Sequence, residues 1–212
     1  MTSSRWFWLV RFTLLVLAAI AASKFAILEV DRPLAVFFKR GANSPWVATA
    51  QMLIVLSIPA LFVFILALVY HHVMTGEEPQ SRNRILALVL SGVLAILCVE
   101  IVKPVLDRIS IDEYLATGSY GFRFLTFTGR THLSSFPSEY GAIAGVAAAA
   151  LWLIAPVYRP TVIALGMLLP GCQVITATDF LSDVIAGLAI GIINFLGICK
   201  LFQIVGGFTF HG

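Results

Sequence analysis

Charged and phenolic side chains stand at three places where polar segments of this chain meet apolar runs. The first is CVEIVKPVLDR, in which Glu100, Lys103 and Asp107 are three and four residues apart and therefore share one helix face. The second is FPSEYGAIAG, residues 136–145, and the third is TDFLSDVIAGLAIG, residues 178–191. Ammonium, carboxylate and phenol groups of this kind bind anions or transfer protons when they converge.

Each of the three places also has a structural interpretation. Charges on one helix face at this depth are tolerated when they pair with one another. Ser138 and Thr178 are suitable helix N-caps, and an acidic residue in the first turn, such as Glu139 or Asp183, is favoured by the helix dipole. Both interpretations remain open from the residues alone.

The composition predicts an integral membrane protein, because 59% of the residues are hydrophobic, 12% are charged and the mean hydropathy is +0.96. Runs that could each cross a hydrocarbon core of about 30 Å as a helix occur six times. They span roughly 6–28, 46–70, 85–106, 138–156, 160–178 and 180–205. We therefore expect an all-α six-helix bundle that forms a single domain over residues 1–212, with both termini on one face.

Small residues predict which of these helices pack together. The fourth span carries Gly141-x-x-x-Gly145 and the sixth carries Gly187-x-x-x-Gly191, spacings that let helix backbones approach closely in lipid. We expect these two helices to pack in the middle of the bundle. Residues 36–40 combine apolar side chains with two basic ones and are typical of a short interfacial helix.

The net charge and the spacing of possible metal ligands indicate which kinds of partner the protein binds. The net charge is +3 and the basic residues are scattered, so membrane lipids, anionic ones above all, are expected partners and nucleic acid is not. Carboxylates and histidines do not converge at a metal-ligand spacing, so no metal and no cofactor is expected. Basic residues divide almost evenly between the two faces, which leaves the orientation in the membrane undetermined.

Taken together, the order and spacing of the three places resemble the phosphatidic acid phosphatase type 2 family of membrane lipid phosphatases, over about residues 46–205. The first motif of that family is a Lys followed after six residues by Arg-Pro. Lys103 matches its Lys, whereas positions 110 and 111 are Ser and Ile. Arg108 lies two residues earlier, where many members carry an additional Arg.

The other two motifs are kept in outline and altered at their reactive positions. Pro-Ser-Gly-His becomes Pro-Ser with Glu139 and Tyr140 in place of Gly-His. In the third motif, Ser-Arg, five residues, His, three residues, Asp, this chain has Gln173 at the Arg and Asp179 at the His, and it retains Asp183. The resemblance therefore implies the six-helix fold with degenerate catalytic motifs.

The resemblance also implies what these changes remove. In the family the third-motif His attacks phosphorus, the Asp matched by Asp183 orients it, and the second-motif His protonates the leaving oxygen. Here Asp179 is the conceivable replacement nucleophile, through an aspartyl phosphate, and Tyr140 is a poor acid. The neighbouring carboxylate would raise a pKa rather than activate a nucleophile. We therefore interpret Tyr140, Asp179 and Asp183 as vestigial catalytic positions.

Residues that could hold a phosphate or headgroup are more numerous. They are Lys103, Arg108, Ser138, Arg123, Arg130 and His132. Guanidinium groups clamp phosphoryl oxygens in pairs, yet these arginines could equally pair with Asp112, Glu113 or Glu139. His132 could be a catalytic base or a loop residue near lipid headgroups. The resemblance requires Lys103, Arg108 and Ser138 to converge in one pocket.

Three functions remain open, of which the first is favoured by the loss of both histidines. The chain is a pseudo-phosphatase that binds a lipid or isoprenoid phosphate, or serves as a subunit of a membrane complex. Alternatively, it is an active variant phosphatase or phosphotransferase on a lipid or polyprenyl (pyro)phosphate. As a small transporter it would need an aqueous path to Glu100 from both faces. The resemblance implies a bacterial inner membrane.

Overall fold

The computed structural model describes residues 2–75, 79–125, 134–154 and 159–206, and these form helices joined by short loops. The long helices are α1 (Thr2–Phe25), α3 (Pro45–Thr75), α4 (Pro79–Leu106), α6 (Glu139–Ile154), α7 (Arg159–Ile175) and α8 (Leu181–Gly206). A π-helical turn, η1 (Ala26–Val30), joins α1 to α2 (Asp31–Arg40), and α5 (Ile111–Thr117) is a short helix after α4. The all-α prediction is confirmed for the described residues, and each predicted span coincides with one long helix.

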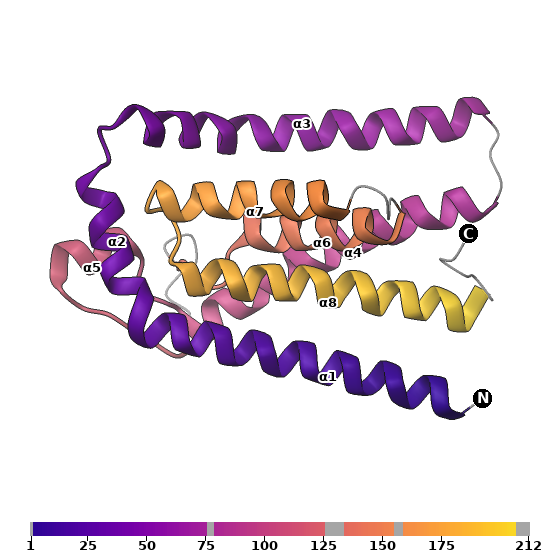
Figure 1. Ribbon diagram of the computed structural model, residues 1–212, viewed down its shortest axis with the longest axis horizontal. Helices are drawn as coiled ribbons and strands as arrows, with labels where there is room; N and C mark the ends of the chain where they lie inside the picture. Colours follow the sequence, from indigo (N-terminus) through magenta and orange to yellow (C-terminus); the bar gives the residue numbers. More distant parts are fainter. Residues whose placement is uncertain (1, 76–78, 126–133, 155–158, 207–212) are drawn as a thin grey trace.

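Three stretches of the described chain are long and apolar enough to cross a membrane: Trp8–Arg40, Asn83–Leu106 and Leu181–Gln203. Shorter apolar stretches lie within α3, α6 and α7, at Pro45–Ser57, Glu139–Leu153 and Gly166–Ile175. These helices support a membrane protein. The first stretch is longer than expected, because it includes α2, which follows α1 through η1 and turns away from the direction of α1 (Figure 1). Residues 36–40 lie in α2, and its expected place at the membrane interface stays a prediction.

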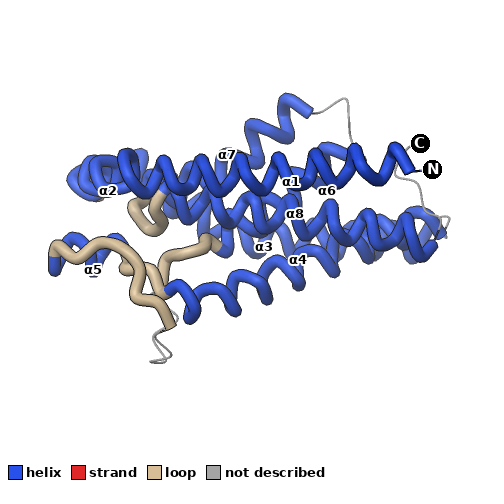
Figure 2. The backbone as a smooth tube through the Cα atoms, turned by 90° about the horizontal axis from the view of Figure 1, so that it is seen from below, coloured by secondary structure: helices blue, strands red, loops and turns tan. Residues whose placement is uncertain are grey.

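The long helices lie side by side, and α2 and α5 lie at one end of the bundle (Figure 1). The start of α1 and the end of α8 both lie at the opposite end. Seen from below, α2, α5 and the loops around them occupy the same end (Figure 2). The three segments singled out in the sequence meet here.

The centre of the bundle is the contact between α6 and α8, which is the most extensive helix pair of the described chain. A Cβ atom added to Gly191 would overlap the carbonyl oxygen of Ala142, and one added to Gly187 would overlap that of Ser138. The predicted close packing of the two glycine motifs is therefore confirmed. It also fixes the start of α6 against α8, where the Ser138 N–H donates to the Asp183 carbonyl oxygen at 3.1 Å.

Candidate functional site

One polar cavity of about 280 Å³ lies where the ends of α3, α4, α6 and α7 meet. Its lining brings together four residues that the sequence singled out, Lys103, Ser138, Tyr140 and Asp179. The other lining residues are Ile54, Ser134, Ser135, Pro137, Glu139, Gln173 and Thr178. Hydroxyl, carboxylate, amide and ammonium groups thus face one space that is large enough for a small polar group.

Lys103 is the cation of this cavity, and acidic residues bind it. Its ammonium donates to Glu139, which also lines the cavity, and lies 3.3 Å from a carboxylate oxygen of Glu100. Its side chain is only 12% exposed, so the pair with Glu139 is partly shielded from water. The Glu139 carboxylate therefore neutralises the Lys103 ammonium inside the cavity.

Ser138 is both the N-cap of α6 and a residue that lines the cavity. It is 1% exposed, and its hydroxyl oxygen accepts the Gly141 N–H at 3.1 Å, so it caps α6 as predicted. Asp179 lines the same cavity. Burial raises the pKa of Asp179 to about 6, against the opposing effects of the Ser138 hydrogen bond and the Lys103 charge.

Replacing Asp179 by asparagine is expected to stabilise the protein at pH 7.5 but not at pH 4. A carboxyl whose pKa is about 6 in the folded state and about 4 unfolded stabilises most below pH 4, and this contribution is lost as the pH rises through 6. The Asp179→Asn variant does not undergo that loss, which we expect to amount to about 3 kcal/mol at neutral pH. Thermal unfolding of both proteins between pH 4 and pH 8 measures it.

Asp112→Asn is the matched control, because the Asp112 side chain is 78% exposed and pairs with Lys39 at the surface. This variant should show no gain that grows with pH. Equal unfolding temperatures for wild type and Asp179→Asn from pH 4 to pH 8 would contradict the raised pKa of Asp179.

Behind the cavity lies a second layer of polar residues, centred on Arg108. This residue is 0% exposed, and its guanidinium donates to Asp183 and Ser182 through one nitrogen and to Asp31 at 2.7 Å through the other. The guanidinium carbon lies 4.3 Å from the ring centre of Phe180. Arg108 and Asp183 therefore form a buried ion pair, and neither residue lines the cavity.

Lys103 and Ser138 thus line one cavity, whereas Arg108 lies outside its lining. Arg108 follows the last turn of α4, where its main chain pairs with Phe122 and its N–H donates to the Ser134 hydroxyl at 3.0 Å. This geometry turns the side chain inward. Arg108 contacts the cavity wall indirectly. It pairs with the Asp183 side chain, and the main-chain carbonyl oxygen of Asp183 accepts the N–H of the cavity residue Ser138.

Asp31 is a buried member of this layer that the sequence interpretation missed. It is 1% exposed, and one of its oxygens accepts the Ser182 N–H at 3.0 Å, while the other accepts from Arg108. Asp31 was not among the residues singled out in the sequence, since it follows a long apolar span and belongs to none of the three motif regions. An acidic residue that continues an apolar helix without interruption is the signal that could have marked it as buried and paired.

Tyr120 completes the layer from the loop after α5. Burial, the largest cause, raises the pKa of Tyr120 to about 12, so its hydroxyl stays protonated at neutral pH. The hydroxyl accepts from Arg108 at 2.9 Å and donates to the Ile27 carbonyl oxygen at 2.8 Å. The loop is thereby tied to the junction between α1 and α2.

Arg123 takes the alternative that the sequence left open, pairing with acidic residues. It donates two hydrogen bonds to Glu113, at 2.6 and 3.2 Å, and its Nε lies 3.2 Å from Asp107. Arg123 does not line the cavity. Arg130 and His132 lie outside the described residues, so their expected part in phosphate binding stays a prediction.

The fold and this site define a helical membrane protein with a polar cavity at one end, in which a lysine is paired with a carboxylate. Comparison with known proteins gives two lipid A 1-phosphatases, from Rhizobium johnstonii and Rhizobium etli, each 36% identical over 103 residues. The aligned region is 49% of this chain and 40% and 42% of the two relatives, so it spans about two fifths of their length. No family model and no solved structure matches. The similarity supports a relationship to lipid phosphatases.

Proposed function

We propose that this chain is a single-domain, six-span membrane protein related to lipid phosphatases, which binds a lipid headgroup in its polar cavity without hydrolysing it. The similarity to two lipid A 1-phosphatases supports a phosphorylated lipid as the class of ligand. The cavity supports a headgroup phosphate, because it offers Lys103 and Ser138 as donors to the phosphate oxygens and Glu139 and Asp179 as acceptors for a phosphate hydroxyl. We place the protein in a bacterial inner membrane.

The observation that carries this proposal is the pairing of Lys103 with Glu139 inside the cavity. Catalysis of phosphoryl transfer depends on positive groups that are positioned on the phosphoryl oxygens. Here the lysine is neutralised, and the Asp179 carboxyl, with a pKa of about 6, is mostly ionised at pH 7 and repels the same oxygens. Such a cavity holds a headgroup without stabilising the transition state.

Purified full-length protein is therefore expected to release no phosphate above background from phosphatidic acid, phosphatidylglycerol phosphate or undecaprenyl pyrophosphate. It should nevertheless bind short-chain phosphatidic acid. Because Glu139 competes with the ligand for Lys103, Glu139→Gln should raise that affinity about tenfold, the effect of one charge-assisted interaction. Titration calorimetry with dihexanoyl phosphatidic acid measures the change.

Glu100→Gln is the matched control, since Glu100 also contacts Lys103 but is not among the residues that line the cavity. It should leave the affinity nearly unchanged. Absence of binding to wild type and to both variants would refute the headgroup site. Phosphate release that Asp179→Asn abolishes would refute the non-hydrolysing assignment.

An active variant phosphatase or phosphotransferase is the second candidate, because Asp179 shares the cavity with Lys103 and Ser138. Turnover would then proceed through an aspartyl phosphate, and the release assay with Asp179→Asn decides between the two. A role as a subunit of a membrane complex predicts copurification of the partner with the tagged chain. The transport alternative relied on Glu100, which is not among the cavity-lining residues.

A further inference from the structure

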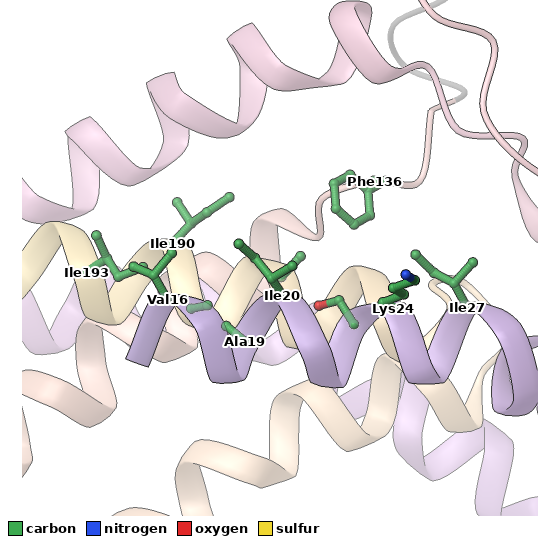
Figure 3. A pocket seen from close by; sticks show the side chains of 11 residues that line it. Val16, Ala19, Ile20, Lys24, Ile27, Phe136, Ile190 and Ile193 are labelled. Atoms are coloured by element: carbon green, nitrogen blue, oxygen red, sulfur yellow. The ribbon is translucent and has the colours of Figure 1, made fainter. Parts of the chain in front are cut away.

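An apolar groove of about 360 Å³ lies between α1 and α8, separate from the polar cavity, with which it shares no lining residue. Figure 3 shows Val16 and Ile193 toward one end of it and Lys24 with Ile27 toward the other, where Phe136 lies over them. Apart from Ser23 and Lys24, its lining is apolar or aromatic. The groove therefore excludes polar ligands along most of its length.

The length of the groove matches one leaflet of a bilayer. Its lining on the first helix runs from Val16 to Ile27, which corresponds to about 16 Å at a rise of about 1.5 Å per residue. Half of a hydrocarbon core of about 30 Å is about 15 Å. Both helices belong to stretches that are long and apolar enough to cross a membrane. A groove of this length fits one acyl chain.

Lys24 gives the groove a charged end. It is exposed, it lies on the side of the bundle where α2 and the polar loops gather, and within the described part of the chain no ion pair is formed by it. A lysine near the end of a spanning helix extends to the level of the lipid headgroups. There its ammonium is complementary to a lipid phosphate.

We propose that this groove binds one acyl chain of an anionic phospholipid whose phosphate pairs with Lys24. This lipid is held by α1 and α8, and it is distinct from the headgroup that we assign to the polar cavity. The inference does not rest on the proposed function, because the residues that bind in the two places are different.

Native mass spectrometry of the full-length protein tests this proposal, after incubation with equal amounts of dioleoyl phosphatidylglycerol and dioleoyl phosphatidylcholine. Wild type should retain one phosphatidylglycerol in preference to phosphatidylcholine. Lys24→Gln should lower that preference about fivefold, the effect expected of one lysine near a lipid phosphate. Arg11→Gln, on the same helix but not in the groove lining, should leave it unchanged.

Substitutions that fill the groove with a larger side chain test whether the groove binds an acyl chain. Ala189→Phe should abolish retention of both lipids, and Ala19→Phe serves the same purpose from α1 if the first variant does not fold. Leu17→Phe is the control, since Leu17 is 56% exposed and does not line the groove.

Several results would overturn the proposal. They are no lipid retained by wild type, an unchanged lipid preference in Lys24→Gln, or unchanged retention in folded groove-filled variants. A lipid-free dimer that the groove-filling variants dissociate would assign the groove to a second copy of the chain instead. Glu139→Gln, which alters only the polar cavity, should leave lipid retention in the groove unchanged, so failure of one proposal is distinguishable from failure of the other.

Discussion

Replacement of Arg108 by methionine is expected to lower the free energy of unfolding by about 3–5 kcal/mol, the usual effect of removing one partner from a buried ion pair. The guanidinium lies between Asp31 and Asp183, and all three side chains are fully buried. Methionine fills much of the volume but leaves both carboxylates without their cation. Unfolding in mixed micelles, followed by circular dichroism, measures the loss.

The same measurement on Arg40→Met provides the control. Arg40 ends α2 and is exposed, so its replacement should change the stability by less than about 0.5 kcal/mol. Adding Asp31→Asn to Arg108→Met should recover part of the loss, because one uncompensated charge is removed with its partner. If the double variant is less stable than Arg108→Met, the charge of Asp31 is not the cause.

Replacement of Gly191 by alanine is expected to destabilise the protein by about 3 kcal/mol, although alanine is the better helix former. The added methyl group would overlap the carbonyl oxygen of Ala142 and would come within 2.7 Å of the Val146 nitrogen, and neither backbone atom can rotate away. The central helices α6 and α8 would have to separate. Unfolding in the same micelles reports the change.

Gly197→Ala on the same helix is the matched control, because a Cβ atom there meets nothing within 4 Å. It should be neutral, or stabilising by up to about 1 kcal/mol. Similar effects of the two substitutions would mean that the α6–α8 contact is looser than described.

The helices and their central contact could be predicted from the sequence, because both depend on local patterns. Apolar runs long enough to span a bilayer gave the long helices, and the glycine spacings indicated which pair lies closest. Lys103, Ser138 and Asp179, which the resemblance to lipid phosphatases singled out, all line the polar cavity. Each of these inferences uses either residues that are close in the sequence or the spacing of residues within a motif.

What the sequence could not predict are contacts between distant residues of opposite charge. Asp31 pairs with Arg108 across 77 positions, and Glu139 pairs with Lys103 across 36. Several acidic residues could have reached each cation, and the choice depends on how the helix ends are placed in space. Arg108 does not line the cavity, because its guanidinium is held by Asp31 and Asp183.

The ion pair of Asp31 also sets an order for how the protein is assembled during synthesis. Asp31 emerges from the ribosome long before its partners, since Arg108 follows 77 residues later and Ser182 follows 151 residues later. The first helix can enter the bilayer early, but the end that carries this carboxylate can reach its final place only after the start of the last helix has been made. Docking of the first helix against the start of the last helix is therefore a late event in the assembly of the protein.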